Sequence, residues 1–154
     1  MSEIHIVVGS VFGAAISVAD DVIEWLEAAQ VTVQRDEAPD AANLAAILVA
    51  KPPDLLLVIT STTGNGDLPD DLQPFYAMLR NTPPAIAGLK YAVIVLGDSS
   101  YETFCGGGLA LDEALLDIGA TRVAEPLLID AMESDEPEIE ALAYVKSLPG
   151  ELFN

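Results

Sequence analysis

Three short apolar runs are the most prominent feature of the chain. They occupy residues 4–8, 54–60 and 91–96, and each is nearly uninterrupted and rich in β-branched side chains. Such a run is typical of a strand buried on both faces, as in the centre of a parallel sheet, whereas a strand with one wet face alternates apolar and polar residues. Weaker runs at residues 31–33 and 122–129 predict shorter or edge strands.

Segments with helical periodicity separate these runs. Between residues 16 and 26, apolar side chains recur at steps of three and four, and acidic side chains occupy the opposite face. The same spacing predicts a helix after Pro69, with Asp70 as its N-cap, and another that stops at Gly119. Two further helices are expected over residues 40–50 and 136–148.

The alternation of strands and helices defines the fold class. It predicts an α/β protein with a doubly wound, five-stranded parallel sheet and helices on both faces. The chain has 154 residues, with no linker, repeat or low-complexity tract, and is expected to form one domain over residues 1–154. Ligands of such sheets bind beyond the carboxyl ends of the strands, where the strand order reverses. The loops after the first, third and fourth strands are therefore candidate binding loops.

Each of these loops is unusual in composition. The first runs from Gly9 into a helix through small residues. Its backbone N–H groups and the helix N-terminus suit a phosphate, although a simple tight turn would have the same composition. The second, residues 60–70, is rich in hydroxyls and longer than a connection requires, and the third, residues 97–108, sets two aromatic rings among small residues. Together they predict a ligand with a phosphate at one end and a flat ring at the other.

Composition and charge exclude several classes of protein. The chain has 6 Lys and Arg residues, scattered singly, against 25 Asp and Glu residues, and its formal net charge is −19 at pH 7. Because nucleic acids and anionic membranes require clustered cations, neither is an expected partner. No apolar segment approaches about 18 residues and the first residues do not resemble a signal peptide, so the expected location is the cytoplasm. The single cysteine, Cys105, fits a reducing compartment.

Two of the loops carry motifs of a known family. Residues 96–106, Leu-Gly-Asp-Ser-Ser-Tyr-Glu-Thr-Phe-Cys-Gly, and residues 60–67, Thr-Ser-Thr-Thr-Gly-Asn-Gly-Asp, resemble the two loops of flavodoxins that contact the flavin ring. With residues 127–131, they make the whole chain similar to the short-chain bacterial flavodoxins of the YqcA and MioC type, with an uninterrupted fifth strand. The resemblance implies a flavodoxin-like fold, non-covalent FMN, and electron transfer in place of stand-alone catalysis.

The resemblance also assigns cofactor contacts to three sets of residues. The phosphate would be held by Ser10, Val11, Phe12, Gly13, Ala14 and Ala15; the inner side of the ring by Ser61, Thr62, Thr63, Gly64 and Asn65; and the outer face by Gly97, Asp98, Ser99, Ser100, Tyr101, Phe104 and Cys105. The Tyr101 ring would stack on the flavin. The chain departs from many flavodoxins at Val11, Phe12 and Ala15, where they carry Thr, and at Thr63, where many carry an aromatic residue.

Partners follow from the same resemblance. A basic NADPH-dependent flavodoxin or ferredoxin reductase would reduce a monomeric protein, and an acceptor enzyme of unknown identity would oxidise it. The acid excess would steer basic partners and lower the potential of the flavin. Two alternatives remain. One is an NAD(P)H:quinone-type flavoenzyme, although the chain has little spare length to form a substrate pocket. The other is a flavin-binding accessory protein that acts by docking to a partner.

Other chemistries find little support in the residues. A phosphoacceptor domain needs paired acids after the first strand and a lysine after the fifth, where this chain has Gly9 and Asp130. A metal site is not expected, because the acids lie on exposed helix faces and His5 is the only histidine. A Ser-His-Asp hydrolase is not expected either, because His5 lies at the start of the first strand, away from the candidate loops, and no Gly-x-Ser-x-Gly motif occurs. Cys105 is expected to pack, since Asp98 and Glu102 would raise its pKa.

Overall fold

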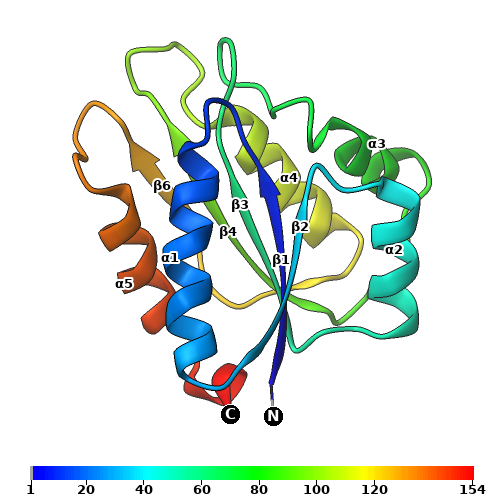
Figure 1. Ribbon diagram of the computed structural model, residues 1–154. Coiled ribbons are helices and arrows are strands. Elements are labelled where there is room, and N and C mark those ends of the chain that lie inside the picture. Colours follow the sequence, from blue (N-terminus) through cyan, green and yellow to red (C-terminus); the bar gives the residue numbers. More distant parts are fainter. Residues whose placement is uncertain (1) are drawn as a thin grey trace.

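A parallel sheet forms the centre of the computed structural model, which describes residues 2–154, so that Met1 of the expected domain lies outside the described residues. Its strand order is β2-β1-β3-β4-β5, and β6 also pairs with β4 (Figure 1). The strands are β1 (Glu3–Gly9), β2 (Thr32–Glu37), β3 (Leu55–Thr60), β4 (Lys90–Gly97), β5 (Thr121–Arg122) and β6 (Leu127–Asp130). The doubly wound α/β class is confirmed, and the strand order reverses between β1 and β3.

Helices cover both faces of this sheet (Figure 1). The helices are α1 (Ala14–Ala28), α2 (Ala41–Ala50), α3 (Gln73–Asn81), α4 (Gly106–Asp117) and α5 (Pro137–Lys146), followed by a 3₁₀ turn, η1 (Gly150–Phe153). The helices α1 and α5 pack together on one face, and α2, α3 and α4 lie on the other. Each predicted helix is therefore present.

The central strands are buried on both faces. Every residue of β3 is buried, which explains its uninterrupted apolar sequence. Successive residues of β1 point to opposite faces, so that Ile6 and Val8 pack in the cluster under α1 and α5 while Val7 packs under α2 to α4. By contrast, β2 is an edge strand whose residues are exposed or half-buried. Because its second half is polar and charged, only residues 31–33 show the apolar pattern of a strand in the sequence.

The start of α3 differs from its prediction. The helix begins at Gln73 with Leu72 as its N-cap, and Asp70 is exposed in the preceding turn without capping it. The Leu72 N–H donates to the carbonyl oxygen of Pro69 at 3.0 Å and closes that turn. Residues 70–72, which the periodicity placed at the start of the helix, therefore belong to this turn. The side chain of Asp71 reaches across to the loop after β1.

The predicted last strand is interrupted, which corrects the expectation of an uninterrupted fifth strand. Between the two pairings, the partner on β4 advances from Tyr91 to Ile94, by three residues, while the last strand advances from Arg122 to Leu127, by five. Two extra residues therefore loop out at this edge. Pro126 lies in the break, and because it has no N–H to donate to a ladder it favours the interruption.

His5, on β1, gives the fold a dependence on pH. Its side chain is buried, at 5% exposure, and its Nε2 lies 3.8 Å from the Asp36 carboxylate. Burial lowers the pKa of His5 below 6.5, and the raising effects of Asp36 and Glu3 do not offset it. The folded state therefore resists a proton that the unfolded chain accepts.

We expect the free energy of unfolding to decrease as the pH falls below about 6.5, and this loss to level off below the folded-state pKa. Urea unfolding at pH 7.5 and 5.5 measures it, with the non-titrating variant His5→Gln as control. The wild type should lose up to about 1.4 kcal/mol of unfolding free energy for each pH unit by which the pKa of His5 lies below 6.5, and the variant should show no such loss. Equal pH dependence in the two proteins would contradict the assignment to His5.

Candidate functional site

The loops after β1, β3, β4 and β6 enclose a cavity of about 390 Å³ at one edge of the sheet. This edge holds the carboxyl ends of the strands and lies toward the top of Figure 1. The lining residues that the sequence predicted are Val11, Phe12, Ala14, Ser61, Thr62, Thr63, Gly64, Gly97, Asp98, Tyr101 and Cys105. All three predicted loops therefore meet at one site.

The loop after β1 presents unpaired backbone donors. Phe12 and Gly13 both have positive φ, at 60° and 85°, and they turn the chain into α1, which has no side-chain cap. Within residues 2–154, the N–H groups of Val11, Phe12, Ala14 and Ala15 have no hydrogen-bond acceptor. Free N–H groups at a helix N-terminus favour an anion. This end of the cavity is therefore suited to a phosphate.

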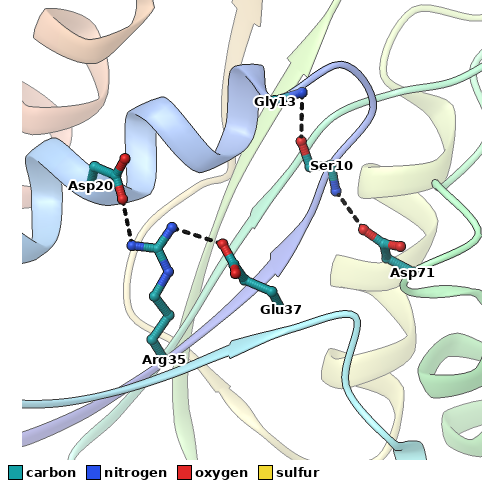
Figure 2. A network of polar contacts seen from close by, with 6 residues as sticks. All are labelled: Ser10, Gly13, Asp20, Arg35, Glu37 and Asp71. Atoms are coloured by element: carbon teal, nitrogen blue, oxygen red, sulfur yellow. Dashed lines mark hydrogen bonds and ion pairs between the residues drawn. The ribbon is translucent and has the colours of Figure 1, made fainter.

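Ser10 shapes the same loop without lining the cavity. Its N–H donates to the Asp71 carboxylate at 3.0 Å, and its Oγ accepts from the Gly13 N–H at 3.1 Å (Figure 2). The hydroxyl proton of Ser10 remains available to a ligand, because the hydroxyl acts as an acceptor in the second bond. Gly13 is the N-cap of α1, and Ala15 is buried beneath it.

The loop after β3 forms a small hairpin. Thr63 and Asp67 exchange two backbone hydrogen bonds, of 2.9 and 2.8 Å, and Gly64 follows with φ of 54°. Asn65 is exposed at the tip and does not line the cavity. Ser61 lines the cavity and is only 6% exposed, and its buried Oγ has no hydrogen-bond partner among residues 2–154. Because buried polar atoms are normally paired, this hydroxyl fits a polar ligand atom.

The loop after β4 places a ring at the mouth of the cavity. Tyr101 is half-exposed, and the Asp98 carboxylate accepts from the Ser100 N–H at 2.8 Å and from its hydroxyl at 2.6 Å. Neither Ser99 nor Ser100 lines the cavity. Phe104, predicted at the outer ring face, is half-buried against the apolar core on the α4 side instead.

Cys105 lies at the start of α4 and is fully buried. Burial raises the pKa of this thiol to about 11, with a smaller contribution from the charge of Asp130 and an opposing one from Thr62. The thiol is therefore neutral near pH 7 and packs, as the sequence predicts. The contributing carboxylate is that of Asp130, in place of the predicted Asp98 and Glu102.

Sequence reasoning missed one wall of the cavity, the segment that follows β6. Asp130 accepts from the N–H groups of Ser99 and Met132, both at 3.0 Å. The Ser99 side chain, followed by these two N–H groups, lowers the pKa of Asp130. On this wall, at the end of β6 and beyond it, the missed lining residues are Ile129, Ala131, Ser134 and Pro137. Gly66, Leu96 and Thr103, on the β3 and β4 side of the cavity, were also missed. Since β6 is a parallel neighbour of β4, the rule that pointed to the other loops could have found this segment.

Among residues 2–154, no cationic side chain lines the cavity, whereas the acidic residue Asp98 does. An anion bound there would depend on neutral N–H and hydroxyl donors. Residues 2–154 contain no group of three His, Cys, Asp or Glu side chains arranged to hold a metal ion. In the same part of the chain, no helix combines the length and apolarity that crossing a membrane requires.

Comparison with known proteins bears on this arrangement. A family model described as Flavodoxin matches residues 6–143. The flavodoxin YqcA of Pectobacterium carotovorum subsp. carotovorum is 41% identical over 149 residues, 96% of this chain and 95% of that protein. Protein MioC of Escherichia coli (strain K12) is 35% identical over 147 residues, 96% of each chain. A cysteine-to-alanine variant of a flavodoxin from Pseudomonas aeruginosa matches in structure with a TM-score of 0.81, at 39% identity over 94% of each chain.

Proposed function

Because the chain belongs to the flavodoxin family, we propose that its cavity binds FMN without a covalent bond and that the protein is a low-potential one-electron carrier. The observation that carries the proposal is the set of unpaired N–H groups at Val11, Phe12 and Ala14, three residues that line the same cavity as the half-exposed Tyr101 ring. An anion site and an aromatic ring in one cavity match a phosphorylated, planar cofactor.

The chain's own residues would bind and orient the cofactor. The free N–H groups of Val11, Phe12 and Ala14 and the Ser10 hydroxyl would hold the phosphate. Ser61 would offer its unpartnered hydroxyl to a polar atom of the ring. Tyr101 would cover the outer face and exclude water from it. FMN itself supplies the redox chemistry, while the protein supplies position and electrostatics.

The acidic surroundings favour a low potential. Asp98 lines the cavity and Asp130 lies directly behind the Ser99 backbone. Added negative charge on the cofactor would be repelled by these carboxylates, and about 1.4 kcal/mol of repulsion corresponds to about 59 mV for a one-electron step. These carboxylates are therefore expected to lower the reduction potential of the bound flavin.

We further propose a monomeric cytoplasmic carrier that accepts electrons from a basic NADPH-dependent flavodoxin or ferredoxin reductase and passes them to an acceptor enzyme. The support is the formal net charge of −19, which would attract basic partners and accelerate their encounter. Such attraction is screened by salt, so the reduction rate should fall as ionic strength rises.

Two measurements test the proposal: a visible spectrum of the purified protein, and a titration with FMN of the stripped protein, from which any bound flavin has been removed. We expect a yellow protein that binds FMN with one-to-one stoichiometry and is reduced by a flavodoxin reductase with a salt-sensitive rate. A colourless protein that does not bind added FMN would contradict the proposed FMN binding and favour the accessory protein whose function is docking. Steady turnover of a quinone with NAD(P)H and no reductase would favour the flavoenzyme.

A further inference from the structure

A carboxylate contacts the backbone of the loop after β1, residues 10–15, which we call the phosphate loop. Asp71, which follows the hairpin after β3, accepts the Ser10 N–H at 3.0 Å (Figure 2). The side chain of Asp71 is half-buried, and the two residues lie 61 positions apart in the sequence. This bond therefore joins the loops after β1 and β3 across the point where the strand order reverses.

No cation offsets this charge through a contact with the loop. Within residues 2–154, no Lys or Arg forms an ion pair or hydrogen bond with residues 10–15. Arg35, drawn beside α1 in Figure 2, is engaged by Asp20 at 2.6 Å and by Glu37 at 2.8 Å. The phosphate loop thus has a carboxylate at its first residue and neutral donors at the others.

The contact has two opposing consequences for a bound phosphate. It fixes the conformation of the loop, because Ser10 is held at its N–H by Asp71 and at its Oγ by Gly13. It also removes one N–H from the donors available to the ligand and places a negative charge within a Debye length of them. The anchoring needs only an acceptor oxygen, whereas the repulsion needs the charge.

We propose that Asp71 is a positioning residue that holds the phosphate loop through Ser10 while its charge limits the affinity of the site for a phosphorylated ligand. This inference rests on the proposed binding of FMN and adds a specificity determinant to it. An amide at position 71 would keep the acceptor oxygen and remove the charge.

The test compares FMN and riboflavin binding to the stripped wild-type protein and to Asp71→Asn by flavin fluorescence quenching. We expect the Kd for FMN to fall about fivefold in the variant at low ionic strength and the Kd for riboflavin to stay unchanged. The ratio of the two FMN Kd values should approach one at high salt. The matched control is Asp70→Asn, which removes the same charge from the neighbouring exposed residue and should shift the FMN Kd much less.

A second variant separates anchoring from charge. Asp71→Ala removes the acceptor, so hydrogen exchange of the Ser10 amide should accelerate in it and remain slow in Asp71→Asn. Unchanged or weaker FMN binding in Asp71→Asn, or an equal gain for riboflavin, overturns the inference while leaving FMN binding by the wild type intact. Failure of every form to bind FMN overturns the proposed function, and the inference with it.

Discussion

Replacing Gly107 with alanine is expected to weaken FMN binding about ten- to hundredfold and to lower the free energy of unfolding by about 1–3 kcal/mol. A Cβ at this position would lie 2.6 Å from the carbonyl carbon of Asp67 and closer still to the nitrogen of Leu68. Both atoms are backbone, so no rotamer change relieves the overlap. The hairpin after β3 and the start of α4 would have to separate.

The contact matters because it closes the cavity between two loops. The Gly107 N–H donates to the carbonyl oxygen of Gly66, which itself lines the cavity. Gly66 has φ of 118°, and a Cβ there would overlap the backbone of Thr103, another lining residue. Backbone therefore packs directly on backbone where the second and third loops meet.

Flavin fluorescence titration and urea unfolding of the stripped protein measure the two effects separately. Gly150→Ala is the matched control, because a Cβ at Gly150 meets nothing within 4 Å and its φ is not positive. The control should bind FMN as the wild type does. Wild-type affinity in Gly107→Ala would show that the loops tolerate separation and that their packing does not define the cavity.

The central sheet was predictable because burial on two faces leaves a direct trace in the sequence. Most residues of β3 and β1 are apolar because water is absent from both sides of these strands, and this requires no particular tertiary partner. The cavity edge followed from the same step, since parallel strands end together. The same rule, extended to β6, also places Ile129 and Ala131 at the cavity.

Features that depend on one tertiary partner left no such trace. The local sequence predicts Asp70 as a helix cap, whereas the contact of the neighbouring Asp71 with the Ser10 N–H depends on a loop 61 positions away in the sequence. The close backbone contact between Gly66 and Gly107 joins residues that are 41 positions apart in the sequence (107 − 66 = 41). The break before Leu127 depends on the register against β4, which the sequence of the last strand alone does not contain.

Asp112 is a further residue of this kind, and it leads to the second large effect. It lies on α4 with a side chain only 4% exposed, and its carboxylate pairs with Arg122 of β5. One of the hydrogen bonds, from Arg122 Nε, is 3.3 Å long, and the Tyr91 hydroxyl donates to the Asp112 carbonyl oxygen at 3.0 Å. The ion pair thus fastens the two-residue strand β5 to the helix beside it.

Arg122→Met is expected to lower the free energy of unfolding by about 2–4 kcal/mol, because it leaves the buried Asp112 carboxylate without its cation. Asp112→Asn should cost less, since the Arg122 side chain is 27% exposed and lies 3.8 Å from Glu125. Urea unfolding of both single variants and the double variant gives the coupling between the two residues.

The matched control is Arg80→Met, which removes the cation of an exposed pair with Asp117 at 2.7 Å. Water solvates both partners of that pair, so its loss should leave stability close to that of the wild type. FMN affinity should stay unchanged in Arg122→Met, because β5 pairs with the amino end of β4, opposite the cavity. It should also stay unchanged in Arg80→Met, since Arg80 does not line the cavity. Equal losses of stability in the two arginine variants would mean that Asp112 is hydrated in solution and that burial does not control the strength of its ion pair.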